Sequence, residues 1–155
     1  MLIHNIEPIF DKNSKILILG SFPSVKSREQ EFFYGHPQNR FWKVISTITK
    51  EVLPQTIEDK KMLLLRNSIA VWDVIKLCDI TGSSDSSITN VVPNDIYRIL
   101  NSADIKRIYA NGDKSYSLFK KYFKELDVIK LPSTSPANAQ YSLERLIEEW
   151  KIILN

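Results

Sequence analysis

The chain has 155 residues, of which 43% are hydrophobic and 25% are charged, and its formal net charge is +3. These totals fit a single globular domain over residues 1–155, and so small a charge does not by itself indicate nucleic-acid binding. The one cysteine, Cys78, excludes an intramolecular disulfide and suits a reducing compartment. Because the chain shows neither a signal-peptide pattern nor an apolar run near ~20 residues, we expect a cytoplasmic protein without a membrane span.

Strand-like and helix-like segments alternate along the chain after an irregular lead-in over residues 1–14. Short apolar runs predict four strands, at Ile16–Leu19, Ile69–Val74, Ile105–Ala110 and Val128–Leu131. Helical spacing and capping residues predict helices from about Asn39 to Pro54, Thr56 to Leu65, Pro93 to Leu100, Asp113 to Leu126, and from Ser142 onward. The segment before Asn39 and the segment from Asp79 to Asn90 are expected to be loops.

This alternation predicts an α/β fold with three layers, α/β/α, in which a parallel sheet lies between helices. In such a sheet the loops that follow all the strands meet at one edge, where α/β proteins bind their ligands. The loop after the first strand is unusually long, since strand–helix connections are normally a few residues. It also concentrates aromatic, rigid and hydrogen-bonding residues, so we expect the site there.

Several common chemistries are poorly supported by the residues present. His4, His36 and Cys78 do not form a metal-ligand cluster, and Cys78 has no obvious paired histidine. The chain also has no Gly-x-Ser-x-Gly elbow, and its four glycines form no phosphate-binding or dinucleotide motif. We therefore expect no metal and no cofactor.

The remaining groups suit a flat, neutral, hydrogen-bonding ligand such as a nucleobase. A base taken out of the DNA stack needs an aromatic face and amide groups that read its edge. Phe22 and Tyr34 offer the face, and Asn39 offers a donor and an acceptor. The hydroxyls of Ser133–Ser135 suit a DNA phosphate, and Pro136–Ala139 suits a small wedge.

Four segments resemble motifs of the uracil-DNA glycosylase superfamily, and most closely those of its hypoxanthine-DNA (deoxyinosine) glycosylase branch. They are Leu17–Ser24 (LILGSFPS), Tyr34–Trp42 (YGHPQNRFW), Gly82–Ile88 (GSSDSSI) and Leu131–Ala137 (LPSTSPA). The resemblance implies a four-stranded parallel sheet with strand order 2-1-3-4. It also implies double-stranded DNA containing a deaminated base as the partner, and we expect a monomer associated with the nucleoid.

The sequence departs from the wider superfamily at two positions. Many members carry Asp or Asn where this chain has Phe22, and one uracil-specific branch carries His where it has Ser133. The hypoxanthine branch is thought to depend instead on a downstream asparagine, which corresponds to Asn39. The resemblance therefore implies removal of hypoxanthine, with a uracil or G/U-mismatch glycosylase, or a DNA-binding module without catalysis, as the alternatives.

The site residues expected from this resemblance fall into three groups. Asn39 is the catalytic candidate, although it stands where a helix N-cap would stand. The base-binding candidates are Ser21, Phe22, Tyr34 and Asp85, with Tyr34 stacking on the extruded base. The DNA-binding candidates are Ser133, Ser135, Pro136, Ala137 and Asn138. With no well-placed lysine nucleophile, we expect hydrolysis without strand cleavage.

Overall fold

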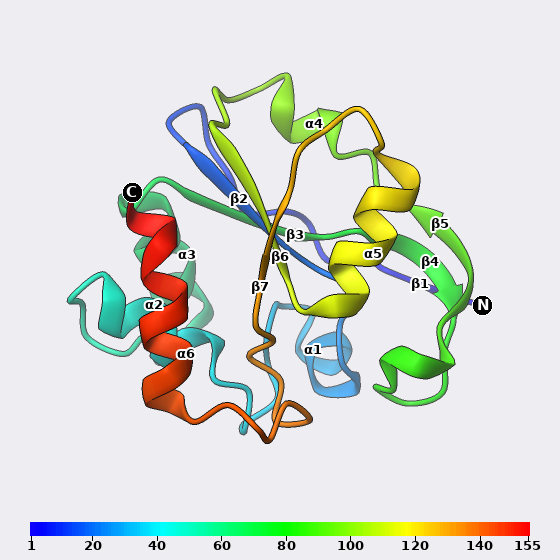
Figure 1. Cartoon of the computed structure of the whole chain (residues 1–155), viewed down its shortest axis with the longest axis horizontal. Helices are drawn as coiled ribbons and strands as arrows, with labels where there is room; N and C mark the ends of the chain where they lie inside the picture. Colours follow the sequence, from blue (N-terminus) through cyan, green and yellow to red (C-terminus); the bar gives the residue numbers. More distant parts are fainter.

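The computed structural model describes residues 1–155, which form a central sheet of four parallel strands (Figure 1). The strands are β2 (Ile16–Gly20), β3 (Ile69–Asp73), β6 (Arg107–Asn111) and β7 (Ile129–Leu131). Their order, β3-β2-β6-β7, places the second strand of the sheet beside the first and then the third and fourth, as the resemblance implied. All residues of β2 and β3 are buried, which explains why both strands are continuous apolar runs.

Helices cover both faces of this sheet, so the predicted three-layer class is confirmed (Figure 1). On one side lie α2 (Phe41–Ile48), α3 (Ile57–Arg66) and α6 (Leu143–Trp150), and on the other lies α5 (Asp113–Tyr122). The rings of Phe41 and Trp150 meet edge to face at 5.8 Å, which joins α2 to α6. No helix combines the length and the apolar character that crossing a membrane requires.

A second, antiparallel sheet was not predicted. It contains β1 (Leu2–Ile3), β4 (Ile75–Asp79) and β5 (Thr89–Pro93), in the order β1-β4-β5. The expected loop after Val74 is wrong, because Val74 is the only residue between β3 and β4. Lys76 in β4 and Thr89 and Asn90 in β5 are polar and exposed, so these segments lack the continuous apolar pattern that marked the central strands.

Other boundaries differ from the sequence expectations for local reasons. The long loop after β2 contains a short helix, α1 (Val25–Gln30), whose N-cap Ser24 accepts a bond from the Ser27 amide at 3.1 Å. Helix α2 ends at Ile48, well before Pro54, and Lys50 beyond it has a φ of 58°. The remaining short helices are α4 (Tyr97–Leu100) and the 3₁₀ turns η1 (Asp85–Ser87) and η2 (Lys151–Leu154).

Two predicted N-caps are confirmed and a third is shifted. Thr56 accepts a hydrogen bond from the Asp59 amide at 3.0 Å, and Ser142 accepts one from the Arg145 amide at 3.1 Å. Asp113 is the first residue of α5 rather than its cap. Gly112 takes the cap position with a φ of 97°, a conformation that favours glycine.

Candidate functional site

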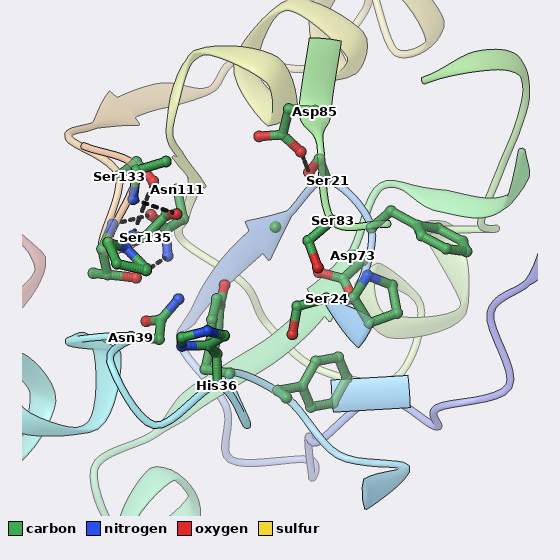
Figure 2. A pocket seen from close by; sticks show the side chains of 18 residues that line it. Ser21, Ser24, His36, Asn39, Asp73, Ser83, Asp85, Asn111, Ser133 and Ser135 are labelled. Carbon is green, nitrogen blue, oxygen red and sulfur yellow. Dashed lines mark hydrogen bonds between the residues drawn. The ribbon is translucent and has the colours of Figure 1, made fainter. Parts of the chain in front are cut away.

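A cavity of about 300 Å³ lies at the carboxyl edge of the central sheet, where the sequence predicted the site (Figure 2). Its wall is formed by the loops after β2 and β7, by the last residues of β3 and β6 (Asp73 and Asn111), and by the segment between β4 and β5 that contains Ser83 and Asp85. Its lining includes every predicted site residue except Asn138: Ser21, Phe22, Tyr34, Asn39, Asp85, Ser133, Ser135, Pro136 and Ala137. Asn138 instead supports the loop from behind, since its side-chain amide donates to the Ser133 carbonyl at 3.0 Å.

Asn39 lies two residues before the first residue of α2, at the edge of the cavity beside His36 (Figure 2). Its Oδ1 accepts a hydrogen bond from the amide of Phe41 at 2.9 Å, although the formal N-cap residue is Arg40, whose side chain makes no capping bond. The oxygen of Asn39 therefore helps to hold the first turn of the helix. The amide nitrogen Nδ2 remains as a donor for a group inside the cavity.

Tyr34 enters the cavity wall from a strained backbone, with a φ of 52°. One face of its ring stacks on Phe41, with centroids 4.0 Å apart and an interplanar angle of 17°. A base could therefore stack only on the opposite face. The hydroxyl of Tyr34 is buried and makes no hydrogen bond of good geometry. Burial and the charge of Asp73 raise the pKa of this phenol far above its usual range, and the nearby Asn111 side chain only partly opposes that shift.

Ser21 and Asp85 form a linked pair on another wall of the cavity (Figure 2). The Ser21 hydroxyl donates to Asp85 Oδ1 at 2.9 Å, which joins the loop after β2 to the loop between β4 and β5. Asp85 is exposed at the cavity mouth, yet partial burial of its carboxyl raises the pKa, while the Ser21 bond and the charge of Lys114 oppose that shift. The carboxyl is thus available to a ligand that enters the cavity.

The loop after β7 contains all five predicted DNA-binding residues, and its own serines bond to its backbone. Ser133 Oγ accepts from the Ser135 amide, and Ser135 Oγ accepts from the Ala137 amide, each at 3.1 Å. These amides are therefore occupied, and Pro136 has no amide hydrogen. The serine hydroxyl hydrogens remain as the donors that this loop can offer to an anionic group.

Arg40, at the start of α2, makes several hydrogen bonds to the backbone of the same loop. Its guanidinium donates to the backbone carbonyls of Ser135 and Asn138, both at 3.0 Å, and to that of Tyr141. Its own amide donates to the Thr134 carbonyl at 3.0 Å. Arg40 thus joins the segment that contains Asn39 to the predicted DNA-binding loop.

The sequence analysis did not identify two residues that line the cavity or a third that holds one of them in place. Asp73 ends β3 inside the cavity and is 4% exposed, and His4 Nε2 lies 2.7 Å from its Oδ2. Asn111 ends β6, and its side chain exchanges bonds with Thr134 at 3.0 and 3.1 Å. A polar residue at the carboxyl end of an apolar strand was the available signal for Asp73 and Asn111. His4 had no such signal, because it reaches Asp73 only through the unpredicted second sheet.

The fold and cavity define an α/β protein that can take a small, flat, hydrogen-bonding group into the carboxyl edge of its sheet. The chain belongs to the uracil DNA glycosylase superfamily, since the model of that family matches residues 7–153. The predicted family is thereby confirmed.

Individual relatives agree with this assignment. The chain is 30% identical over 156 residues to a protein of Methanosarcina acetivorans named hypoxanthine DNA glycosylase, with 99% of this chain and 98% of that protein covered. It is 38% identical over 111 residues to a protein of the same name from Methanosarcina barkeri, covering 70% of each. A solution NMR structure from M. acetivorans, provisionally assigned as a uracil DNA glycosylase, superposes with a TM-score of 0.80 at 32% identity, covering 96% of this chain and 94% of that one.

Proposed function

We propose that this protein is a monofunctional DNA glycosylase that hydrolyses the N-glycosidic bond of a deaminated base in double-stranded DNA, with hypoxanthine as the main substrate. The observation that carries the proposal is the cavity itself. Aromatic rings, amides and hydroxyls from the carboxyl edge of the four-stranded sheet and from the segment between β4 and β5 meet around about 300 Å³. Two relatives named hypoxanthine DNA glycosylase support the choice of base.

Breaking an N-glycosidic bond places positive charge on the sugar and negative charge on the departing base, much as glycoside hydrolysis does. A hydrogen-bond donor aimed at the base stabilises that negative charge. Asn39 Nδ2 is suited to this task, because the Phe41 amide already fixes the orientation of the side chain through Oδ1. In this mechanism Phe22 lines the wall and Ser21 and Asp85 approach the base or sugar from the other side.

The loop after β7 would contact the DNA backbone next to the extruded nucleotide. Its hydroxyls at Ser133 and Ser135 can donate to a phosphate. Pro136 and Ala137 line the cavity at the same edge and would enter the space that the nucleotide leaves. Asn138 would act by supporting this loop, because its amide bonds to the Ser133 carbonyl.

The test is incubation of the protein with labelled duplexes that contain one deoxyinosine, one deoxyuridine or only normal bases, followed by hot alkali. We expect an abasic product from the inosine duplex, and no strand break before alkali treatment. Cleavage at uracil alone would instead assign a uracil glycosylase. Salt-sensitive binding without any abasic product would leave a DNA-binding module, and the proposal would be abandoned.

A further inference from the structure

The two histidines of the chain differ in how their ring nitrogens are bonded. The His4 side chain is fully buried, and both nitrogens have partners: Nδ1 accepts from the Ile6 amide at 3.1 Å, and Nε2 lies 2.7 Å from Asp73 Oδ2. His36 lines the cavity, and its Nδ1 accepts from the Gln38 amide at 3.1 Å. Its Nε2 makes no hydrogen bond within the protein, and the mechanism above does not use it.

The bond from Gln38 fixes which nitrogen of His36 carries the proton. A nitrogen that accepts a hydrogen bond has no proton of its own, so the proton of the neutral imidazole lies on Nε2. A charged ring would have to release the Gln38 amide. Nε2–H of His36 is therefore a donor without an acceptor in the protein.

A tight turn holds His36 and Asn39 together. The Asn39 amide donates to the His36 carbonyl at 2.9 Å, which closes a four-residue turn over 36–39. Pro37 takes the second position of this turn, where its fixed φ is favoured. Both side chains line the cavity, and Figure 2 shows them next to each other.

The side chains of His36 and Asn39 repeat one arrangement. In each, the acceptor atom is bonded to the backbone amide two residues further on, from Gln38 to Nδ1 at 3.1 Å and from Phe41 to Oδ1 at 2.9 Å. What remains in each is an N–H group, on Nε2 of His36 and on Nδ2 of Asn39. This wall of the cavity therefore offers two donors, and such a pair suits a group that carries negative charge.

The proposed reaction creates such a group. When the C1′–N9 bond of deoxyinosine breaks, its electron pair passes to the base, and the negative charge spreads over the ring nitrogens and O6. Water adds its oxygen to C1′, and its proton is released to solvent or to the departed base. Donors that are already in place stabilise the developing charge more in the transition state than in the bound substrate.

We infer that His36 is a second catalytic residue, whose neutral ring donates Nε2–H to the departing base beside Asn39 and keeps its proton throughout. The inference rests on the proposed function and adds a residue to it. The acceptors N7 and O6 of hypoxanthine are also present in guanine, so the two donors accelerate bond cleavage and do not by themselves select the base.

Two amide substitutions separate the two nitrogens of the ring. His36→Asn places an amide oxygen where Nδ1 accepts from Gln38, a bond that asparagine makes readily in turns, but its side chain stops short of Nε2. His36→Gln is one methylene longer and can present an NH₂ group where Nε2–H stands. Gln38→Ala is the control, because it keeps the backbone amide that His36 accepts.

The first measurement is the single-turnover rate on a deoxyinosine duplex at saturating protein. We expect His36→Asn to lower this rate about tenfold to a hundredfold, and His36→Gln to stay within about fivefold of the wild type. Gln38→Ala should have the wild-type rate. In an Asn39→Asp background, His36→Asn should still slow the reaction, whereas a loss that vanished there would show that His36 acts only through Asn39.

The second measurement is the affinity for a duplex that contains 2′-fluoro-2′-deoxyinosine, in which the fluorine opposes positive charge on the sugar and slows cleavage. A donor that acts in the transition state should leave this affinity within about twofold of the wild type in His36→Asn. A weaker affinity with an unchanged saturated rate would assign His36 to ground-state binding, such as a phosphate contact, and would overturn the inference.

The outcomes also separate this inference from the proposed function. If the wild type excised no inosine, the proposed function would fail, and the role of His36 with it. If the wild type excised inosine and His36→Asn did so at the same saturated rate, only the role of His36 would be wrong. Thermal unfolding checks that each variant folds, and His36→Phe, which keeps a ring without a donor, replaces His36→Asn if that variant does not fold.

Discussion

The two polar atoms of the Asn39 side chain have different surroundings. The sequence left open whether this residue caps a helix or acts in catalysis, and the two roles prove compatible. Oδ1 holds the Phe41 amide at 2.9 Å, while Nδ2 stays free at the cavity edge. The local role fixes the orientation that the proposed chemical role needs, so conservative substitutions can separate them.

Asn39→Asp should separate stability from activity. The carboxylate can still accept the Phe41 amide, so the midpoint of thermal unfolding should stay close to that of the wild type. It cannot donate to a departing base, and the single-turnover rate should fall by roughly 10²–10³. Asn39→Ala should show a similar fall in the single-turnover rate and also a lower unfolding midpoint. If Asn39→Asp kept full activity, Asn39 would not act as a hydrogen-bond donor to the base.

Asp85 allows a prediction about pH. Its folded-state pKa is raised, first by burial, so the folded protein holds this proton more tightly than the unfolded chain does. The stability from that proton is present below the unfolded pKa and is lost as pH rises through the folded pKa. As the pH rises from the unfolded pKa of Asp85 through its folded pKa, the wild type should therefore lose stability relative to Asp85→Asn. Above the folded pKa the difference in stability should stay constant.

Thermal unfolding midpoints of both proteins between about pH 3 and about pH 8 measure this difference. The effect should be modest because Asp85 is exposed at the cavity mouth. If the unfolding midpoint of the wild type rose relative to that of Asp85→Asn with increasing pH, the prediction would be wrong. Loss of excision activity in the same variant would show that the carboxyl is kept for function at a cost in stability.

At the scale of elements, the continuous apolar strands were predictable because burial on both faces leaves an unambiguous pattern. Helix starts at Thr56 and Ser142 were equally clear, since capping depends on residues three apart. The second sheet was not, because β1 and β4 pair across more than seventy residues, β1 has only two residues, and Lys76 and Asp79 interrupt the apolar pattern of β4. The contact of His4 with Asp73 could not be predicted for a related reason, since it depends on that pairing.

Arg40 shows that a basic residue within a predicted DNA-binding segment can have a purely structural role. A basic residue beside a predicted DNA-binding motif looks like a phosphate contact, yet its guanidinium donates to the carbonyls of Ser135, Asn138 and Tyr141. These residues lie about a hundred positions further along the chain, and nothing in the local pattern indicates them. Arg40 is therefore a positioning residue for the loop after β7.

Arg40→Gln should weaken specific binding to damaged duplex by about tenfold or more, because a glutamine amide cannot donate to three carbonyls in the geometry of a guanidinium. The slope of log affinity against log salt should stay unchanged, whereas loss of a direct phosphate contact would reduce it by about 0.9. Lys43→Gln, on the exposed side of α2, is the charge-matched control. A reduced slope for Arg40→Gln alone would assign Arg40 to the DNA backbone.

For the molecule as a whole, the cavity is lined by the loops after β2 and β7, by the ends of β3 and β6 and by the segment between β4 and β5, so a bound ligand should stabilise the entire fold. A duplex with a stable abasic analogue at about 100 times its dissociation constant should add ~2.7 kcal/mol. For a protein of this size that corresponds to a rise of roughly 5–10 °C in the unfolding midpoint. An undamaged duplex of equal length is the control, and an equal rise with both would indicate binding without recognition of damage.

The single residue between β3 and β4 has a practical consequence for handling the protein. Through Val74 the floor of the cavity continues into β4, which pairs with β1, and β1 is followed directly by His4. The amino group of Met1 also lies 3.3 Å from Asp79 in β4. The other terminus lies with the amino ends of β2 and β3, at the edge opposite the cavity (Figure 1). A purification tag or fluorescent fusion therefore belongs at the carboxyl terminus, because one at the amino terminus would pull on the strand that orients Asp73.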